Sequence, residues 1–255
     1  MNDLIIDQQD CIVGMAELGA GSVSAIVTSP PYNIGLKYDK HLDRKDDYLP
    51  WMRMVFGGCS RVLSDKGHFF LQMGGTSKRP LIPYEVVQEA LAAGFVLQNE
   101  VTWVKNITVA GRSSGQFKPI NSLRFLNNTN ERIFHLTKNG EVPIDRLAVG
   151  VPFEYASNSA RWEHKSTTRC DGNSWFIPYE TIQSKADRAN HPAVFPVALP
   201  ERCIRLSGIP KGSLVLDPFC GSGTTLMACK NLGMRGIGFE ISTAYCDAAR
   251  KRLVI

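Results

Sequence analysis

Short apolar runs and longer amphipathic runs alternate along the whole chain. The apolar runs have the length of strands, and the amphipathic runs have the spacing of helices. Predicted strands cover residues 3–7, 23–27, 67–73, 96–105, 131–137, 214–216 and 236–240. Predicted helices cover residues 49–63, 84–93, 197–206, 224–232 and 242–253. This alternation predicts an α/β fold with a doubly wound, mainly parallel sheet.

Three segments interrupt the alternation. Residues 34–48 are polar and mixed in charge, as a surface loop would be. Residues 106–130 are rich in Asn, Ser and Gly and are expected to form a long loop, and residues 141–188 have no clear periodicity. Long ordered loops in compact domains commonly carry function. A chain of 255 residues suits one domain, so we expect residues 1–255 to form a single domain with a small irregular insertion.

Composition narrows the class of protein. The chain is 44% hydrophobic, no apolar run reaches the length of a membrane span, and the N-terminus lacks the basic start of a signal peptide. Its seven cysteines are odd in number and form no CxxC pair, which argues against a disulfide framework or a zinc site and fits a reducing cytoplasm. We therefore expect no membrane association and no bound metal.

Positive charge is concentrated in one part of the chain. Between Lys105 and Cys170 there are ten Lys or Arg against five Asp or Glu, an excess equal to the net charge of +5 of the whole protein. A basic region favours a polyanionic partner such as nucleic acid, although a solvated surface has the same composition.

A glycine turn follows the strand at residues 214–216. Asp217 and Pro218 end the strand, Gly221 and Gly223 permit a sharp turn, and a helix begins at Thr224. Such a turn offers free N–H groups and a positive dipole end to a polar ligand, and the Asp217 carboxylate adds an acceptor. The turn is therefore a candidate cofactor site.

Three nucleotide-like ligands compete for this turn. A P-loop requires a lysine after the second glycine, and none follows Gly223. A dinucleotide fingerprint requires a third glycine where Leu226 stands, although Glu240 is close to the position expected for a ribose contact. NAD is disfavoured but stays open, and the third ligand is S-adenosylmethionine.

A second candidate motif ends the strand at residues 23–27. It reads Thr28-Ser29-Pro30-Pro31-Tyr32. Two consecutive prolines lack N–H groups and fix φ, so they cannot continue a central strand. The turn therefore presents Ser29 and Tyr32 at the carboxyl edge of the sheet, where α/β proteins bind ligands.

Together the two turns resemble a known family. Residues 217–225 resemble the cofactor motif of amino-methylating DNA methyltransferases, and residues 28–32 resemble their catalytic motif, (D/N/S)-P-P-(Y/F/W). A catalytic motif that precedes the cofactor motif is the order of the beta class. The strands at 67–73, 101–105 and 131–137 resemble the intervening motifs. His191–Pro196 resembles the segment before the cofactor strand, although His191 could equally be a structural residue beside a helix start.

This resemblance implies a Rossmann-like methyltransferase fold and S-adenosylmethionine as the cofactor. It implies catalytic roles for Ser29, Pro30, Pro31 and Tyr32. It implies cofactor contacts from Asp10, Cys11, Asp217, Phe219, Cys220, Gly221, Ser222, Gly223, Thr224 and Glu240, with Asp10 and Cys11 near the adenine and Glu240 on the ribose. The match at Asp10 and Cys11 is the shortest of these.

The reaction implied is direct methyl transfer to the exocyclic amine of a base. That amine is a poor nucleophile, and hydrogen bonds accepted from it by Ser29 Oγ and the Pro30 carbonyl would make its lone pair available. The base would leave the duplex and stack on Tyr32. No covalent cysteine is needed, so Cys220 is expected to be a packing residue. Serine at the first motif position favours N4 of cytosine, with N6 of adenine as the alternative.

The partner implied is double-stranded DNA, recognised by residues 106–130 and 141–188. A homodimer and a cognate restriction endonuclease are further possible partners, and the expected setting is the prokaryotic or phage cytoplasm, at the nucleoid. Two other classes stay open at this point. A non-catalytic nucleic-acid-binding module would not need the filled motif positions, and an NAD-dependent oxidoreductase would bind NADH in place of S-adenosylmethionine.

Overall fold

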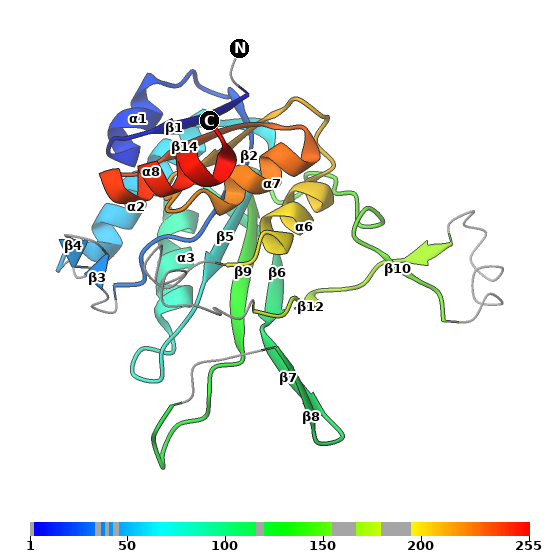
Figure 1. Cartoon of the computed structure of the whole chain (residues 1–255). Coiled ribbons are helices and arrows are strands. Elements are labelled where there is room, and N and C mark those ends of the chain that lie inside the picture. The colour runs from blue at the N-terminus through cyan, green and yellow to red at the C-terminus, as the bar shows by residue number, and fades with distance from the viewer. Residues whose placement is uncertain are drawn as a thin grey trace.

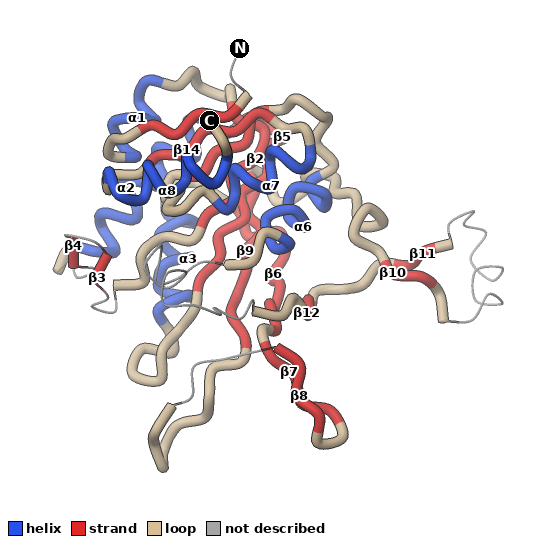
Figure 2. Tube along the Cα trace, viewed as in Figure 1, coloured by secondary structure: helices blue, strands red, loops and turns tan. Residues whose placement is uncertain are grey.

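An eight-stranded sheet forms the centre of the molecule (Figures 1 and 2). The computed structural model describes residues 3–33, 37–38, 41–42, 46–115, 120–154, 167–179 and 195–255. In spatial order the strands are β1 (Leu4–Asp7), β14 (Arg235–Phe239), β13 (Leu214–Asp217), β2 (Val23–Thr28), β5 (Leu63–Met73), β9 (Asn130–Thr137), β6 (Val96–Val104) and β12 (Ser174–Phe176). Within this sheet β9 runs antiparallel to both of its neighbours, and the other pairs are parallel. The predicted mainly parallel α/β sheet is confirmed.

The two central strands come from opposite ends of the sequence. β13 pairs with β2 in parallel, with Val215 opposite Ala25. After β2 the chain continues to β5 on one side, and after β13 it continues to β14 on the other side. The chain therefore diverges between β2 and β13, and in an open α/β sheet the crevice at the carboxyl ends of such strands is the usual binding site.

Helices cover both faces of the sheet. The described helices are α1 (Cys11–Glu17), α2 (Tyr48–Val62) and α3 (Ile82–Ala92) on one face, and α6 (Ala198–Ser207), α7 (Thr224–Leu232) and α8 (Thr243–Leu253) on the other, which is the front in Figure 1. The buried side chains of β5 alternate between the two layers. Phe69 and Leu71 belong to the core under the first three helices, whereas Phe70 belongs to the core under the last three. This alternation follows from the period of two in a strand.

All predicted strands and helices are present, and several further elements are not in the prediction. Helix α1 is short, seven residues, and is capped at its N-terminus by Asp10, whose carboxylate accepts a hydrogen bond from Ile12 N. A helix of two turns is too brief to show a helical period, so the apolar pattern did not reveal it. β12 is three residues long, and its formation depends on pairing with β6 through Trp175, which is buried.

The expectation of a loop over residues 106–130 is wrong for its first part. β7 (Asn106–Val109) and β8 (Arg112–Gly115) form an antiparallel hairpin that projects from the sheet (Figure 1). Ala110 and Gly111 make the turn with φ of 49° and 78°. Two consecutive left-handed residues match the twist of a two-residue hairpin, which explains why this polar stretch pairs with itself.

The remaining described strands are short pairs. β3 (Lys37–Tyr38) pairs with β4 (His41–Leu42), and β10 (Val151–Pro152) pairs with β11 (Thr168–Arg169). Residues 116–119, 155–166 and 180–188 of the predicted recognition segments lie outside the described residues, as do His191 and the three residues after it. No helix in the described ranges is long and apolar enough to cross a bilayer.

Candidate functional site

A buried carboxylate joins the two turns predicted to carry function. Thr28 Oγ1, at the end of β2, donates to Asp217 Oδ1 at 2.6 Å. Thr225 Oγ1, in the first turn of α7, donates to Asp217 Oδ2 at 2.6 Å, and Phe219 N donates to Oδ1 at 3.0 Å. We call Asp217 with these three donors the Asp217 clamp. The clamp fixes the end of β2, the end of β13 and the start of α7 against one another.

Burial decides the electrostatics of the clamp. Asp217 is 2% exposed, and this burial raises the pKa of its carboxyl group to about 6, against the opposing effect of the hydrogen bonds from Thr225 and Thr28. Both carboxylate oxygens are occupied by donors from the protein itself. The structure thus places Asp217 as a link between the two motifs, and its predicted contact with a cofactor stays a prediction.

Replacing Thr225 by valine tests the clamp without changing its shape. The Thr225→Val variant loses one of three donors to a buried carboxylate, and we expect the free energy of unfolding to fall by about 1.5–3 kcal/mol, the value of a hydrogen bond to a charged group. Urea unfolding measures the loss. Thr225→Ser keeps the hydroxyl and is the matched control, so equal stability of the Val variant and the wild type would contradict the clamp.

The glycine turn has the backbone that the sequence predicts. Gly221 and Gly223 have φ of 51° and 79°, in the left-handed region that favours glycine. Gly221 N donates to Glu240 Oε2 at 3.0 Å, and Ser242 N donates to Glu240 Oε1 at 2.8 Å. Glu240 follows β14 directly, so its carboxylate ties the end of that strand to the turn after β13.

The Cys220 side chain packs between the glycine turn and Gly238 of β14. It is buried, and a Cβ placed on Gly238 of β14 would come within 2.5 Å of its sulfur, so the turn can lie this close only over a glycine. Burial, followed by the negative charges of Asp217 and Glu240, raises the pKa of the Cys220 thiol well above its usual value. A neutral buried thiol is a poor nucleophile, which fits the expected packing role.

Three further predicted cofactor residues, Phe219, Ser222 and Thr224, lie in the same turn or at the start of α7. Ser222 and Thr224 are buried, with the Ser222 carbonyl and the Thr224 hydroxyl accepting from Arg252 of α8 at 3.4 and 3.0 Å. Phe219 is half-buried, with its ring 5.6 Å from that of Trp51 in an edge contact. These contacts hold the turn against α8 on one side and α2 on the other.

Asp10 and Cys11 lie at the neighbouring strand end. Asp10 caps α1, which follows β1, and Cys11 is the buried first residue of that helix. The ends of β1 and β14 are paired, with Asp7 opposite Phe239, and Glu240 N donates to the Asp7 carbonyl at 3.1 Å. The structure therefore brings Asp10, Glu240 and the glycine turn to one edge of the sheet.

The Ser-Pro-Pro-Tyr turn sits beside the glycine turn and shares its support. Tyr48, at the start of α2, donates its hydroxyl to the Pro31 carbonyl at 2.6 Å, one helical turn before Trp51 reaches Phe219. The first turn of α2 thus contacts both motifs. Ser29 and Tyr32 are half-buried, and Ser29 Oγ lies 3.3 Å from the Tyr32 hydroxyl.

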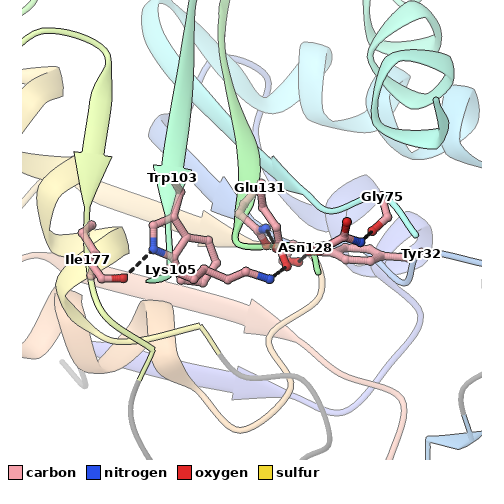
Figure 3. A network of polar contacts seen from close by, with 9 residues as sticks. Tyr32, Gly75, Trp103, Lys105, Asn128, Glu131 and Ile177 are labelled. Atoms are coloured by element: carbon pink, nitrogen blue, oxygen red, sulfur yellow. Dashed lines mark hydrogen bonds and ion pairs between the residues drawn. The ribbon is translucent and has the colours of Figure 1, made fainter. Parts of the chain in front are cut away.

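The Tyr32 hydroxyl belongs to a network of polar side chains that includes Glu131 and Lys105 (Figure 3). It lies 2.9 Å from Gln72 Oε1 and 3.1 Å from Glu131 Oε2. Gln72 Nε2 also donates to Glu131 Oε2, and Lys105 Nζ is 2.6 Å from Glu131 Oε1. Burial and the nearby Glu131 charge raise the pKa of Tyr32 well above its usual value, so the phenol stays protonated and can donate.

The sequence motifs predicted neither this network nor the hydrogen bonds of the Asp217 clamp. Gln72 and Lys105 lie near the carboxyl ends of β5 and β6, and Glu131 lies at the start of the antiparallel β9. All three therefore reach one edge of the sheet, but only the strand order shows it. The sequence signal that could have indicated the network is a polar residue at or near one end of each of these three predicted strands. Among the residues that the structure describes, no group of three or more His, Cys, Asp or Glu could hold a metal ion.

Comparison with protein families finds a match over most of the chain. The N6_N4_Mtase family, described as DNA methylase, matches residues 23–251. The type II methyltransferase M.HpaI of Haemophilus parainfluenzae is 30% identical over 248 residues, covering 96% of this chain and 72% of that protein. The DNA adenine methyltransferase YhdJ of Escherichia coli K12 is 27% identical over 254 residues, covering 96% and 80%.

Solved structures share the fold. The PvuII DNA methyltransferase, whose title calls it cytosine-N4-specific, superposes with a TM-score of 0.74 at 21% identity, covering 98% of this chain and 86% of that one. M1.HpyAVI, solved as a complex with SAM, superposes with a TM-score of 0.59 at 23% identity, covering 98% and 99%. At these identities the likeness concerns the architecture.

Proposed function

Because the chain belongs to the N6_N4_Mtase family of DNA methylases, we propose that it transfers a methyl group to the exocyclic N4 of cytosine in a specific duplex site. Family membership makes the chain an S-adenosylmethionine-dependent DNA methyltransferase acting on an amino group. The choice of cytosine is the finer step. It is supported by Ser29, a hydroxyl at the first position of the catalytic motif, where a carboxylate or amide is more typical of adenine-N6 enzymes.

Adenine N6 is the alternative target. Its support is the 27% identity to a relative named as a DNA adenine methyltransferase. The observation that carries transfer to either amine is the Thr28–Asp217 hydrogen bond of 2.6 Å, which holds the Ser-Pro-Pro-Tyr turn directly beside the glycine turn. A donor held on one turn and a base held on the other would meet at this edge of the sheet.

The glycine turn fits the cofactor. Left-handed Gly221 and Gly223 let the backbone approach a ligand closely, and the start of α7 favours polar groups. We assign Glu240 to the ribose hydroxyls, because hydrogen bonds from Gly221 N and Ser242 N hold its carboxylate beside the glycine turn. We assign Phe219 to the wall of the pocket, and Asp10 with Cys11 to the adenine side. When bound, S-adenosylmethionine supplies an activated methyl group on a sulfonium.

The Ser-Pro-Pro-Tyr turn would prepare the acceptor amine. Ser29 Oγ and the Pro30 carbonyl accept hydrogen bonds from the amine, which draws its lone pair out of the ring and toward the methyl carbon. Pro30 and Pro31 keep both acceptors rigid, and the Tyr48 hydroxyl bond to the Pro31 carbonyl adds to this rigidity. The base reaches the turn by leaving the duplex, and it stacks on the Tyr32 ring.

Duplex recognition is assigned to the segments at 106–130 and 141–188. In the part of these segments that the structure describes, Arg112 on the β7–β8 hairpin and Arg124 are exposed and positively charged, as contacts to phosphates require. A second copy of the chain, or a cognate restriction endonuclease acting on the same site, would extend this recognition. Action on DNA in a bacterial or phage-infected cytoplasm, at the nucleoid, follows from the same proposal.

Methylation in a host that lacks DNA methylation tests the target base. We expect genomic DNA from cells expressing the chain to contain N4-methylcytosine at one short recurring sequence, measured by nucleoside digestion with mass spectrometry and by base-resolved sequencing. Cells carrying the empty vector are the control. N6-methyladenine without N4-methylcytosine would transfer the enzyme to the adenine group, and additional base methylation found only in the RNA of these cells would overturn the DNA assignment.

A further inference from the structure

A chain of hydrogen bonds leads from Ser29 through Tyr32 to the ion pair of Glu131 and Lys105. Figure 3 shows Tyr32, Glu131 and Lys105 of this chain. Ser29 Oγ lies 3.3 Å from the Tyr32 hydroxyl, which lies 3.1 Å from Glu131 Oε2. The other Glu131 oxygen lies 2.6 Å from Lys105 Nζ, and these two side chains are only 17% and 13% exposed. An ionised carboxylate is thus held close to the catalytic serine through one intervening hydroxyl.

The acceptors in this chain fix the direction of its hydrogen bonds. Tyr32 has one proton, and behind it stand two acceptors, the Glu131 carboxylate and the Gln72 amide oxygen at 2.9 Å. Whichever takes that proton, the Tyr32 oxygen meets Ser29 as an acceptor. The Ser29 proton therefore turns toward Tyr32, and the Ser29 lone pairs are left for the amine of the target base.

We propose that Glu131 is a positioning residue that acts through Tyr32, fixing Ser29 as a hydrogen-bond acceptor and drawing positive charge away from the target amine. This inference rests on the proposed function. During transfer the amine nitrogen bonds to the methyl carbon while the carbon–sulfur pair leaves with sulfur, and the nitrogen then gives up one proton. That proton passes to Ser29 Oγ as the Ser29 proton moves to Tyr32 and the Tyr32 proton moves to Glu131. The products are a neutral methylamino base and a neutral thioether.

The hydrogen-bond chain compensates for the weakness of the serine hydroxyl as a hydrogen-bond acceptor. A neutral hydroxyl accepts more weakly than the carboxylate or amide oxygen found at this position in related motifs, and hydrogen bonds in a chain polarise one another. A carboxylate at the far end of the chain restores part of the missing negative charge. Lys105 holds one oxygen of Glu131, which leaves the other aimed at Tyr32. A largely buried ion pair adds little to stability, so its presence here fits a role in the site.

Glu131→Gln removes the charge and keeps the shape. We expect the single-turnover rate of methyl transfer to fall about 10- to 100-fold, because a hydrogen bond to a charged group is replaced by a neutral one. The dissociation constant for S-adenosylmethionine should be unchanged. Glu89→Gln is the matched control. Glu89 lies 2.6 Å from Arg53, is 13% exposed and stands on α3, so its loss tests the removal of an ion pair as such.

A double-mutant cycle separates the relay from a purely structural role. Tyr32→Phe keeps the ring but removes the hydroxyl that links Ser29 to Glu131, so it should also slow transfer about 10-fold or more. Adding Glu131→Gln to Tyr32→Phe should then cost less than about a further threefold. Should Glu131→Gln fail to fold, Tyr32→Phe alone decides, since a rate equal to that of the wild type overturns the inference. An equal loss in both backgrounds also overturns it, whereas a wild type that methylates no base refutes the proposed function instead.

Discussion

Ser29→Ala should reduce the rate of methyl transfer by about 100- to 1,000-fold, the effect of removing one preorganised hydrogen-bond partner from a reacting group. The Ser29 hydroxyl lies at the carboxyl end of β2, and the turn that carries it is fixed by the Asp217 clamp and by Tyr48. Its loss removes an acceptor for the amine without moving the backbone. The measurement is a single-turnover assay with labelled S-adenosylmethionine and saturating DNA.

Binding should separate this effect from a folding defect. The glycine turn does not contact the Ser29 side chain through any described hydrogen bond, so the Ser29→Ala variant should bind S-adenosylmethionine with wild-type affinity in calorimetry. Ser22→Ala is the control, because Ser22 is exposed and precedes β2 at the opposite end of the strand. A Ser29→Ala variant as fast as the wild type would show that the Pro30 carbonyl alone activates the amine.

The apolar pattern predicted the framework because strands and helices here follow simple periods. Each buried strand end also carries a residue that interrupts the pattern, such as the proline pair after β2 or the glycines after β13. These interruptions are local, so they can be read from the sequence. The motifs they form predicted that both turns lie at one edge of the sheet, and the structure brings them together there.

What binds the two turns to each other could not be read in this way. Thr28 and Asp217 are 189 positions apart, and their bond exists only because β2 and β13 are neighbours. Glu131 and Tyr32 are 99 positions apart, and they meet because β9 runs antiparallel and begins where β5 ends. Both contacts depend on strand order and direction, which a motif does not contain. The sequence pattern did not predict α1 and β12 for a related reason. Both are too short to show a period, and they depend on contacts with the rest of the fold.

A pair of buried histidines likewise has no sequence signature. His68 of β5 and His135 of β9 are 67 positions apart, yet their ring nitrogens Nδ1 and Nε2 lie 3.0 Å from each other and Asn99 Nδ2 lies 3.0 Å from His135 Nδ1. Both rings stack near Phe70, and both side chains are almost fully buried. One imidazole must donate and the other accept, so the two rings cannot both be protonated.

Acid should therefore destabilise the protein through this pair. Burial lowers the pKa of His68 from 6.5 to about 4, and burial with the neighbouring His68 lowers that of His135 to about 3. A depressed folded-state pKa gives stability that is present above pH 6.5 and is lost as the pH falls toward 4 and 3. At pH 5 the folded rings are still neutral while the unfolded rings bind protons. Relative to neutral pH, each ring then lowers the free energy of unfolding by about 2 kcal/mol, and the pair lowers it by about 4 kcal/mol.

The variant His68→Phe isolates one half of this effect. It removes one titrating ring, so the loss of unfolding free energy between pH 7.5 and pH 5, measured by urea unfolding, should be about 2 kcal/mol smaller than in the wild type. Asp217 acts in the opposite direction, because its raised pKa makes the folded state bind a proton more tightly, but it does so equally in both proteins and cancels in the comparison. An unchanged pH dependence in His68→Phe would mean that His68 is charged or exposed in the folded protein.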